Sequence, residues 1–152
     1  MKQIQIIADT REQLPVFNAN TIRRALKEGD YSIEGLENHL VLERKSPGDL
    51  YQSILQNHDR FKREIYRATI KGKKFYILVE CKKEIFLSMM WSDRPLRARP
   101  MTLAKIINTI EQRYGIVFVW CHGRDVMKEE IKRILKEYYQ NIFHEDIEII
   151  SG

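Results

Sequence analysis

Hydrophobic and polar residues alternate in two kinds of pattern along this chain, and the patterns predict its secondary structure. Short apolar runs at residues 3–9, 74–80 and 116–120 are too short for typical helices and are rich in β-branched or aromatic side chains, so they predict buried strands. Apolar residues at helical spacing predict amphipathic helices over residues 101–114 and 125–143. Gly115 is a natural C-terminal stop for the first of these two helices.

The first third of the chain predicts a helix followed by a β-hairpin. Residues 18–29 predict a helix capped by Asn18 or Asn20 and stopped by Gly29. Its apolar residues at helical spacing are Ile22, Ala25 and Leu26. Residues 30–45 then alternate, turn at "EGLEN" and return, which is typical of a hairpin.

A long amphipathic helix is expected directly after the hairpin. Ser46 can cap it, Pro47 suits its first position, and Asp49 lies three residues after the cap. Apolar residues recur at helical spacings until Gly72 closes the helix. These residues are Leu50, Ile54, Phe61, Ile65 and Ala68.

The order of elements predicts the fold class. Fully apolar late strands separated by helices indicate parallel strands covered on both faces, and the early hairpin makes the sheet mixed. Residues 146–151 can add a short edge strand. We therefore expect residues 1–152 to form a single domain, an α/β protein built as a three-layer α/β/α sandwich with a mixed central sheet.

Composition narrows the class of protein. The chain has 152 residues, of which 43% are hydrophobic and 31% charged, as in a globular domain. No apolar run approaches the roughly 20 residues that span a membrane, and the N-terminus becomes charged too early for a secretory signal. Cys81 and Cys121 are too far apart for a metal-ligand pair and are predicted to be buried, reduced thiols. A cytoplasmic protein is expected, or a nuclear one if the source is eukaryotic.

Positive charge is concentrated in two places. The formal net charge is only +5, but one cluster within residues 60–74 holds a single acid, Glu64. The basic residues of the two clusters are Arg60, Lys62, Arg63, Arg67, Lys71, Lys73 and Lys74, then Arg94, Arg97, Arg99 and Lys105. Such clusters are either ordinary solvated faces or the electrostatic footprint of a polyanion such as DNA.

Candidate chemistry gathers at the end of the hairpin. Because side chains alternate along a strand, Glu43 and Lys45 share one face and Arg44 takes the other. Antiparallel pairing brings Asp30 close to Glu43, and Asp9 ends the first strand at the same sheet edge. An exposed Glu–Lys ion pair is the ordinary explanation of such a spacing. Converging carboxylates, however, favour a hard divalent cation, Mg²⁺ or Mn²⁺, with Lys45 orienting water or stabilising phosphate charge.

The stretch "GDYSIEGLENHLVLERKSPGDL" closely resembles the signature of the XPF-type (ERCC4-domain) structure-specific endonuclease family, which has a restriction-endonuclease-like fold. The matching residues are Gly29, Asp30, Glu43, Arg44, Lys45 and Asp49. The upstream "DTRE" resembles a second family motif through Asp9, Arg11 and Glu12, and Arg60–Phe61 resembles a third.

The resemblance implies a metal-dependent endonuclease that cuts branched DNA in repair or recombination. It implies that Asp30 and Glu43, with Asp9 nearby, hold the metal, and that Lys45 completes the catalytic set. Arg11, Arg44 and Arg60 would contact phosphate or support the site; Lys62, Arg63 and Arg67 join them as candidate DNA-binding residues on the basic helix. Glu12 and Asp49 would support the site, although a helix cap explains Asp49 as well.

Several alternatives stay open. A DNA-junction scaffold without turnover, dimerising with a partner, would keep the basic surface but bind no metal. Met89, Met90, Trp91 and Pro95 are either a cover over the core or an apolar wedge against DNA. The last helix carries more apolar residues than one buried stripe needs, namely Tyr138, Tyr139, Ile142 and Phe143, which are either core or the seam of a homodimer.

Overall fold

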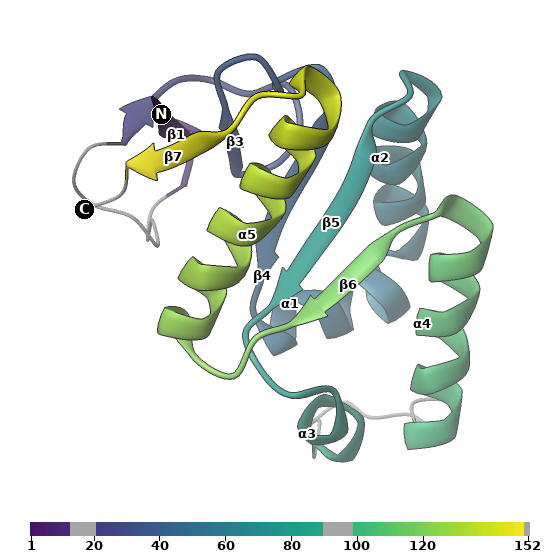
Figure 1. Cartoon of the computed structure of the whole chain (residues 1–152). Coiled ribbons are helices and arrows are strands. Elements are labelled where there is room, and N and C mark those ends of the chain that lie inside the picture. Colours follow the sequence, from purple (N-terminus) through teal and green to yellow (C-terminus); the bar gives the residue numbers. More distant parts are fainter. Residues whose placement is uncertain (13–20, 90–98, 151–152) are drawn as a thin grey trace.

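The computed structural model describes residues 1–12, 21–89 and 99–150, and within them the chain forms a seven-stranded mixed sheet with helices on both faces (Figure 1). The strand order is β2-β1-β3-β4-β5-β6, and β7 also pairs with β1. The strands are β1 (Lys2–Ala8), β2 (Ile22–Arg23), β3 (Tyr31–Ile33), β4 (Leu40–Lys45), β5 (Lys74–Val79), β6 (Val117–Trp120) and β7 (Ile147–Ile150).

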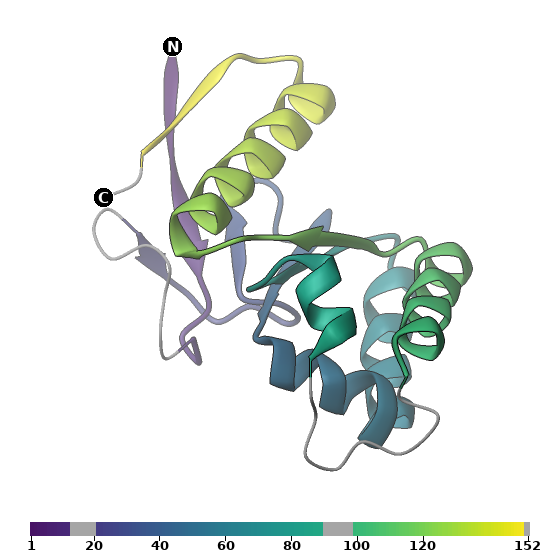
Figure 2. The ribbon, with the colours of Figure 1, turned by 90° about the horizontal axis from the view of Figure 1, so that it is seen from below.

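The helices form a layer on each side of this sheet. They are α1 (Pro47–Tyr51), the π-helix η1 (Gln52–Gln56), α2 (His58–Ile70), α3 (Lys83–Ser88), α4 (Pro100–Tyr114) and α5 (Arg124–Phe143). Helix α5 covers one face, and α1, α2, α3 and α4 lie on the other (Figures 1 and 2). The predicted three-layer α/β/α architecture is therefore confirmed.

The sheet is mixed, as the sequence predicts. Strands β4, β5 and β6 are parallel, whereas β3 pairs antiparallel with both β1 and β4. Alternation along β4 supplies both apolar layers: Leu40 and Leu42 pack in the layer of α5, and Val41 packs in the layer of α2. The register between β4 and β5 thereby fixes the faces toward which the charged end of β4 points.

The predicted helix over residues 18–29 is wrong for its described part, residues 21–29. Ile22 and Arg23 form strand β2, parallel to the end of β1, and the Arg24 N–H donates to the Ala8 carbonyl. Leu26 is buried, but its N–H donates to the carboxylate of Asp9 rather than to a helical carbonyl. These tertiary hydrogen bonds outweigh a weak local preference for helix.

The predicted single helix from Ser46 to Gly72 is also wrong in its continuity. Its start is as predicted, since the Asp49 N–H donates to Oγ of the cap Ser46 at 3.1 Å. The chain then widens into η1 and breaks at Asn57, whose backbone is not helical, before α2 begins. The sequence also gave no prediction for the short helix α3.

The C-terminal half agrees closely with the expectations. Helix α4 ends at Gly115 in the left-handed conformation, and the tail forms β7 beside β1. Both cysteines are free and buried. On α5, Val126 and Ile142 are exposed, whereas Tyr139 is buried in the core.

The apolar loop and the second basic cluster that the sequence predicts lie partly outside the described residues. Met90, Trp91 and Pro95 of the apolar loop, and Arg94 and Arg97 of the second basic cluster, lie outside the described residues. Within the described ranges, no helix is both long and apolar enough to cross a bilayer.

Gly29 is the residue at which the hairpin and the site depend most on the absence of a side chain. Its φ is +83°, and an added Cβ would lie 2.6 Å from Cγ1 of Val41 and 3.1 Å from the Leu42 carbonyl oxygen. We expect Gly29→Ala to lower the free energy of unfolding by about 1–3 kcal/mol, as measured by urea denaturation. Gly48→Ala is the matched control, because a Cβ there meets nothing within 4 Å and should be neutral or stabilising. Equal losses in both variants would contradict this account.

Candidate functional site

The end of β4 opens into a cavity of about 290 Å³ between the sheet and helices α1 and α2. We call it the Lys45 cavity. Its lining residues are Asp30, Glu43, Arg44, Lys45, Asp49, Gln52, Ser53, Asn57, Arg60, Phe61 and Glu64. The cavity thus brings together three of the four residues that the sequence predicts to be catalytic.

Glu43 is the most deeply buried acid of this cavity. Its Oε2 accepts no hydrogen bond and lies 3.7 Å from Nζ of Lys45. Burial, and then the neighbouring carboxyl of Glu64, raise the pKa of Glu43 well above its usual range, and Lys45 opposes this only in part. A buried oxygen without a donor is a strong candidate to bind a cation.

Asp30 lies across the hairpin from Glu43, as the sequence predicts. Its Oδ2 accepts a hydrogen bond of 2.7 Å from the backbone N–H of Arg44. Burial raises the pKa of Asp30 to about 6, against the opposing effect of that hydrogen bond. Asp30 and Glu43 are therefore two desolvated carboxyl groups on one cavity wall.

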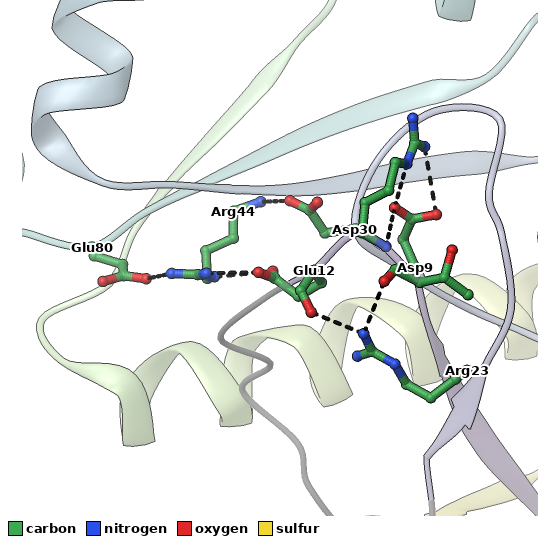
Figure 3. Close-up of polar contacts among 8 residues, drawn as sticks. Asp9, Glu12, Arg23, Asp30, Arg44 and Glu80 are labelled. Atoms are coloured by element: carbon green, nitrogen blue, oxygen red, sulfur yellow. Dashed lines mark hydrogen bonds and ion pairs between the residues drawn. The ribbon is translucent and has the colours of Figure 1, made fainter.

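The side chain of Arg44 points to the opposite side of β4 and enters a separate ion network (Figure 3). It donates to both carboxylate oxygens of Glu12, at 3.1 and 2.8 Å, and also donates to Glu80. Arg23 in turn donates to the Glu12 carbonyl. This arrangement favours the supporting role predicted for Arg44 and Glu12; a phosphate contact by Arg44 stays a prediction.

Asp9 lines a neighbouring cavity of about 320 Å³, which we call the Asp9 cavity. Its lining residues are Asp9, Arg11, Lys27, Glu28, Gly29, Asp30, Glu43, Arg60, Glu64 and Arg67. One oxygen of Asp9 accepts from the Leu26 N–H and the other from Nε of Arg11, each at 2.8 Å. Although burial acts in the opposite direction, the hydrogen bonds from Arg11 and Leu26 hold the pKa of Asp9 below its usual value.

The two cavities share one wall, which consists of Asp30, Glu43, Arg60 and Glu64. Arg60 therefore lies beside the carboxylates, and Arg67 lines only the Asp9 cavity of the two. Lys62 and Arg63 lie on another side of α2 and line neither cavity. Asp49 lines the Lys45 cavity. The helix cap formed by Ser46 uses only the backbone N–H of Asp49, so capping does not explain why an acidic side chain stands at this position.

The residues at this wall fit a divalent cation. Among the described residues, no set of three or more His, Cys, Asp or Glu side chains is close enough to enclose a metal ion. A site built from Asp30 and Glu43 nevertheless suits Mg²⁺, which often takes one or two protein carboxylates and keeps several waters. The unsatisfied Oε2 of Glu43 and the room for water in the Lys45 cavity agree with such a site.

Glu64 is the residue of this site that sequence reasoning missed. It is half-buried, lines both cavities and contacts Glu43. A signal was present in the sequence, because Glu64 is the single acid within residues 60–74, where seven residues are basic.

Comparison with known proteins gives a family match and a similar fold. The family model for the ERCC4 domain matches residues 6–134. Two solved structures of XPF from Aeropyrum pernix match with a TM-score of 0.68, one at 17% identity over 88% of this chain, and one, in complex with DNA, at 18% over 91%. The chain spans 61% and 66% of the length of those two chains. No curated protein matches.

The pKa of Asp30 predicts a pH-dependent cost to the fold. Because this pKa is raised from 3.8 to about 6, the protonated carboxyl favours the folded state below about pH 4, and that contribution is lost as the pH rises through about 6. We expect Asp30→Asn to become more stable than the wild type as the pH rises from about 4 to about 8, in urea denaturation with EDTA. A stability difference between Asp30→Asn and the wild type that stays constant over this pH range would contradict the assignment.

Proposed function

Because the chain belongs to the ERCC4 domain family, a family of nucleases that generally use divalent metal ions, we propose that it is a Mg²⁺- or Mn²⁺-dependent endonuclease of branched DNA. The observation that carries this proposal is the Lys45 cavity, where two buried carboxyl groups and one lysine converge. The fold similarity to XPF from Aeropyrum pernix supports it. We further propose that residues 1–152 act as one nuclease unit.

Each residue of the cavity has a distinct proposed role. Asp30 and Glu43 would hold the cation, which when bound supplies the Lewis acidity that activates water and neutralises phosphate charge. Lys45, whose Nζ lies 3.7 Å from Glu43 and 5.4 Å from the ring centre of Phe61, would contact the scissile phosphate. Asp9 would act indirectly, by supporting the neighbouring residues, since both of its oxygens already accept hydrogen bonds.

The basic residues of α2 would bind the DNA backbone. Arg60 borders both cavities and is exposed, so it can contact the phosphate next to the cleaved bond. Arg11 is the weaker candidate, because its guanidinium already pairs with Asp9 and donates to the Leu26 carbonyl.

The proposal is tested by cleavage of labelled flap, fork, nicked and four-way DNA with Mg²⁺. We expect Glu43→Gln and Lys45→Met each to lower the cleavage rate on the order of 100-fold. The matched controls are Glu129→Gln and Lys132→Met, which alter an ion pair of 3.1 Å on α5, far from the cavity along the chain, and should cut at the wild-type rate. Calorimetric Mn²⁺ titration should show a site in the wild type that Glu43→Gln loses. DNA binding without cutting, and no Mn²⁺ site in either protein, would establish a scaffold instead.

We also propose a homodimer formed through the C-terminal end of α5. Ile142 and Phe143 are 40% and 42% exposed there, next to each other, whereas Tyr139 belongs to the core. Ile142→Glu should convert the dimer to a monomer in sedimentation equilibrium. Val126→Glu, at an equally exposed position roughly opposite on the same helix, should not. A wild type that sediments as a monomer would refute the dimer.

A further inference from the structure

A groove runs between α2 and α4, two helices that lie side by side in Figures 1 and 2. It consists of two adjoining cavities of about 250 and 500 Å³ that share Lys62 and Tyr114. We call it the α2–α4 groove. Its lining residues are His58, Lys62, Arg63, Tyr66, Arg67, Lys105, Ile106, Thr109, Ile110, Arg113 and Tyr114.

The charges around this groove are all positive. Lys62, Arg63, Arg67, Lys105 and Arg113 line it, and none of the described lining residues is acidic. Within the part of the chain that the structure describes, none of these five cations forms an ion pair with an acid. An uncompensated basic groove of this kind attracts a polyanion.

Several cations elsewhere in the described chain are paired with acids. On α5, Arg133 pairs with both Glu130 and Glu137. After the end of α2, Lys71 and the buried Lys73 both pair with Glu28. The groove differs from these two regions because, among the described residues, it has no acidic partner for its cations.

The interior of the groove is apolar and aromatic. Tyr66 is 58% exposed, and Tyr114 is half-buried against the core below. Ile106 and Ile110 of α4 add aliphatic surface. Aromatic rings beside free cations are what unpaired bases stack on, and a duplex does not offer the faces of its bases for such stacking.

The groove is connected to the candidate active site. Arg67 lines both the Asp9 cavity and the α2–α4 groove. Along α2, Lys62 and Tyr66 lie four residues apart, as do Arg63 and Arg67, so these side chains form neighbouring rows on one side of the helix. A strand leaving the carboxylates can therefore pass Arg67 and enter the groove.

We propose that the α2–α4 groove is a second DNA subsite, which holds a short unpaired strand next to the cleavage site. The phosphates lie against Lys62, Arg63, Lys105 and Arg113, and the bases stack on Tyr66 and Tyr114. This inference rests on the proposed nuclease function for the identity of its ligand. It adds a subsite that discriminates a flap from a continuous duplex.

The first test measures binding of a fluorescent oligothymidylate, roughly ten nucleotides long, to the full chain in EDTA. No cleavage is needed for this measurement. We expect Tyr66→Ala to weaken binding roughly tenfold, because base–aromatic stacking is lost, and Tyr66→Phe to bind as the wild type does. Ile70→Ala is the matched control, since Ile70 is 63% exposed on α2 and does not line the groove.

A second pair of variants tests the charges. Lys105→Gln with Arg113→Gln should weaken binding and reduce its dependence on salt concentration. Lys132→Gln with Arg133→Gln removes two paired cations of α5 and should leave both unchanged. Because all these side chains are on the surface, thermal denaturation should confirm that each variant is folded.

Failure of this inference is distinguishable from failure of the proposed function. If Tyr66→Ala and the double variant of α4 bind the oligonucleotide as the wild type does, while Glu43→Gln abolishes cleavage, the groove is not a strand subsite although the nuclease assignment stands. If the same variants change the sedimentation behaviour but not oligonucleotide binding, the groove is a protein interface and the inference is overturned. Loss of oligonucleotide binding in both sets supports the subsite even if no cleavage is detected.

Discussion

Strand β4 places the cavity residues Glu43 and Lys45 on one face and the ion-pairing Arg44 on the other, and the rest of the site depends on that separation. Its pairing with β5 aligns Glu43, Arg44 and Lys45 with three consecutive apolar residues, so the alternation of faces is fixed by a buried ladder. Glu43 and Lys45 enter the cavity while Arg44 anchors the segment that carries Glu12. A shift of the β4–β5 pairing by one residue would exchange the two faces and therefore these roles. The apolar contacts between β4 and β5 stabilise the observed register.

Neutralisation divides the buried acids of this molecule into two groups. Glu12, Glu28 and Asp9 each have a cation at 2.7 or 2.8 Å, and they connect segments of the chain. Asp30 and Glu43 have raised pKa values, because burial outweighs the nearby positive groups, of which Lys45 lies farther away, at 3.7 Å from Glu43. The first group contributes to the integrity of the fold. The second costs stability, and such a cost is typical of residues retained for binding or catalysis.

Local hydrophobic periodicity, and the alternation of side chains along a strand, were sufficient to predict three features. These are the hairpin, the parallel strands β4 to β6 and the convergence of Asp30, Glu43 and Lys45. Prediction from the sequence failed at residues 21–29, where the carboxylate of Asp9 and the edge of β1 determine the backbone. It also missed the contact of Glu64 with Glu43, because the turn from η1 into α2 that brings them together has no simple sequence signature.

The π-helix η1 also restricts how this chain can change length. Asn57 interrupts the helix between η1 and α2, so the segment from Gln52 to Asn57 sets where α2 begins relative to α1. Loss of one residue from this segment would move Phe61 and Ile65 off the core and Glu64 away from β4. Insertions and deletions here are therefore constrained by the packing of α2, and Gln52 also lines the Lys45 cavity.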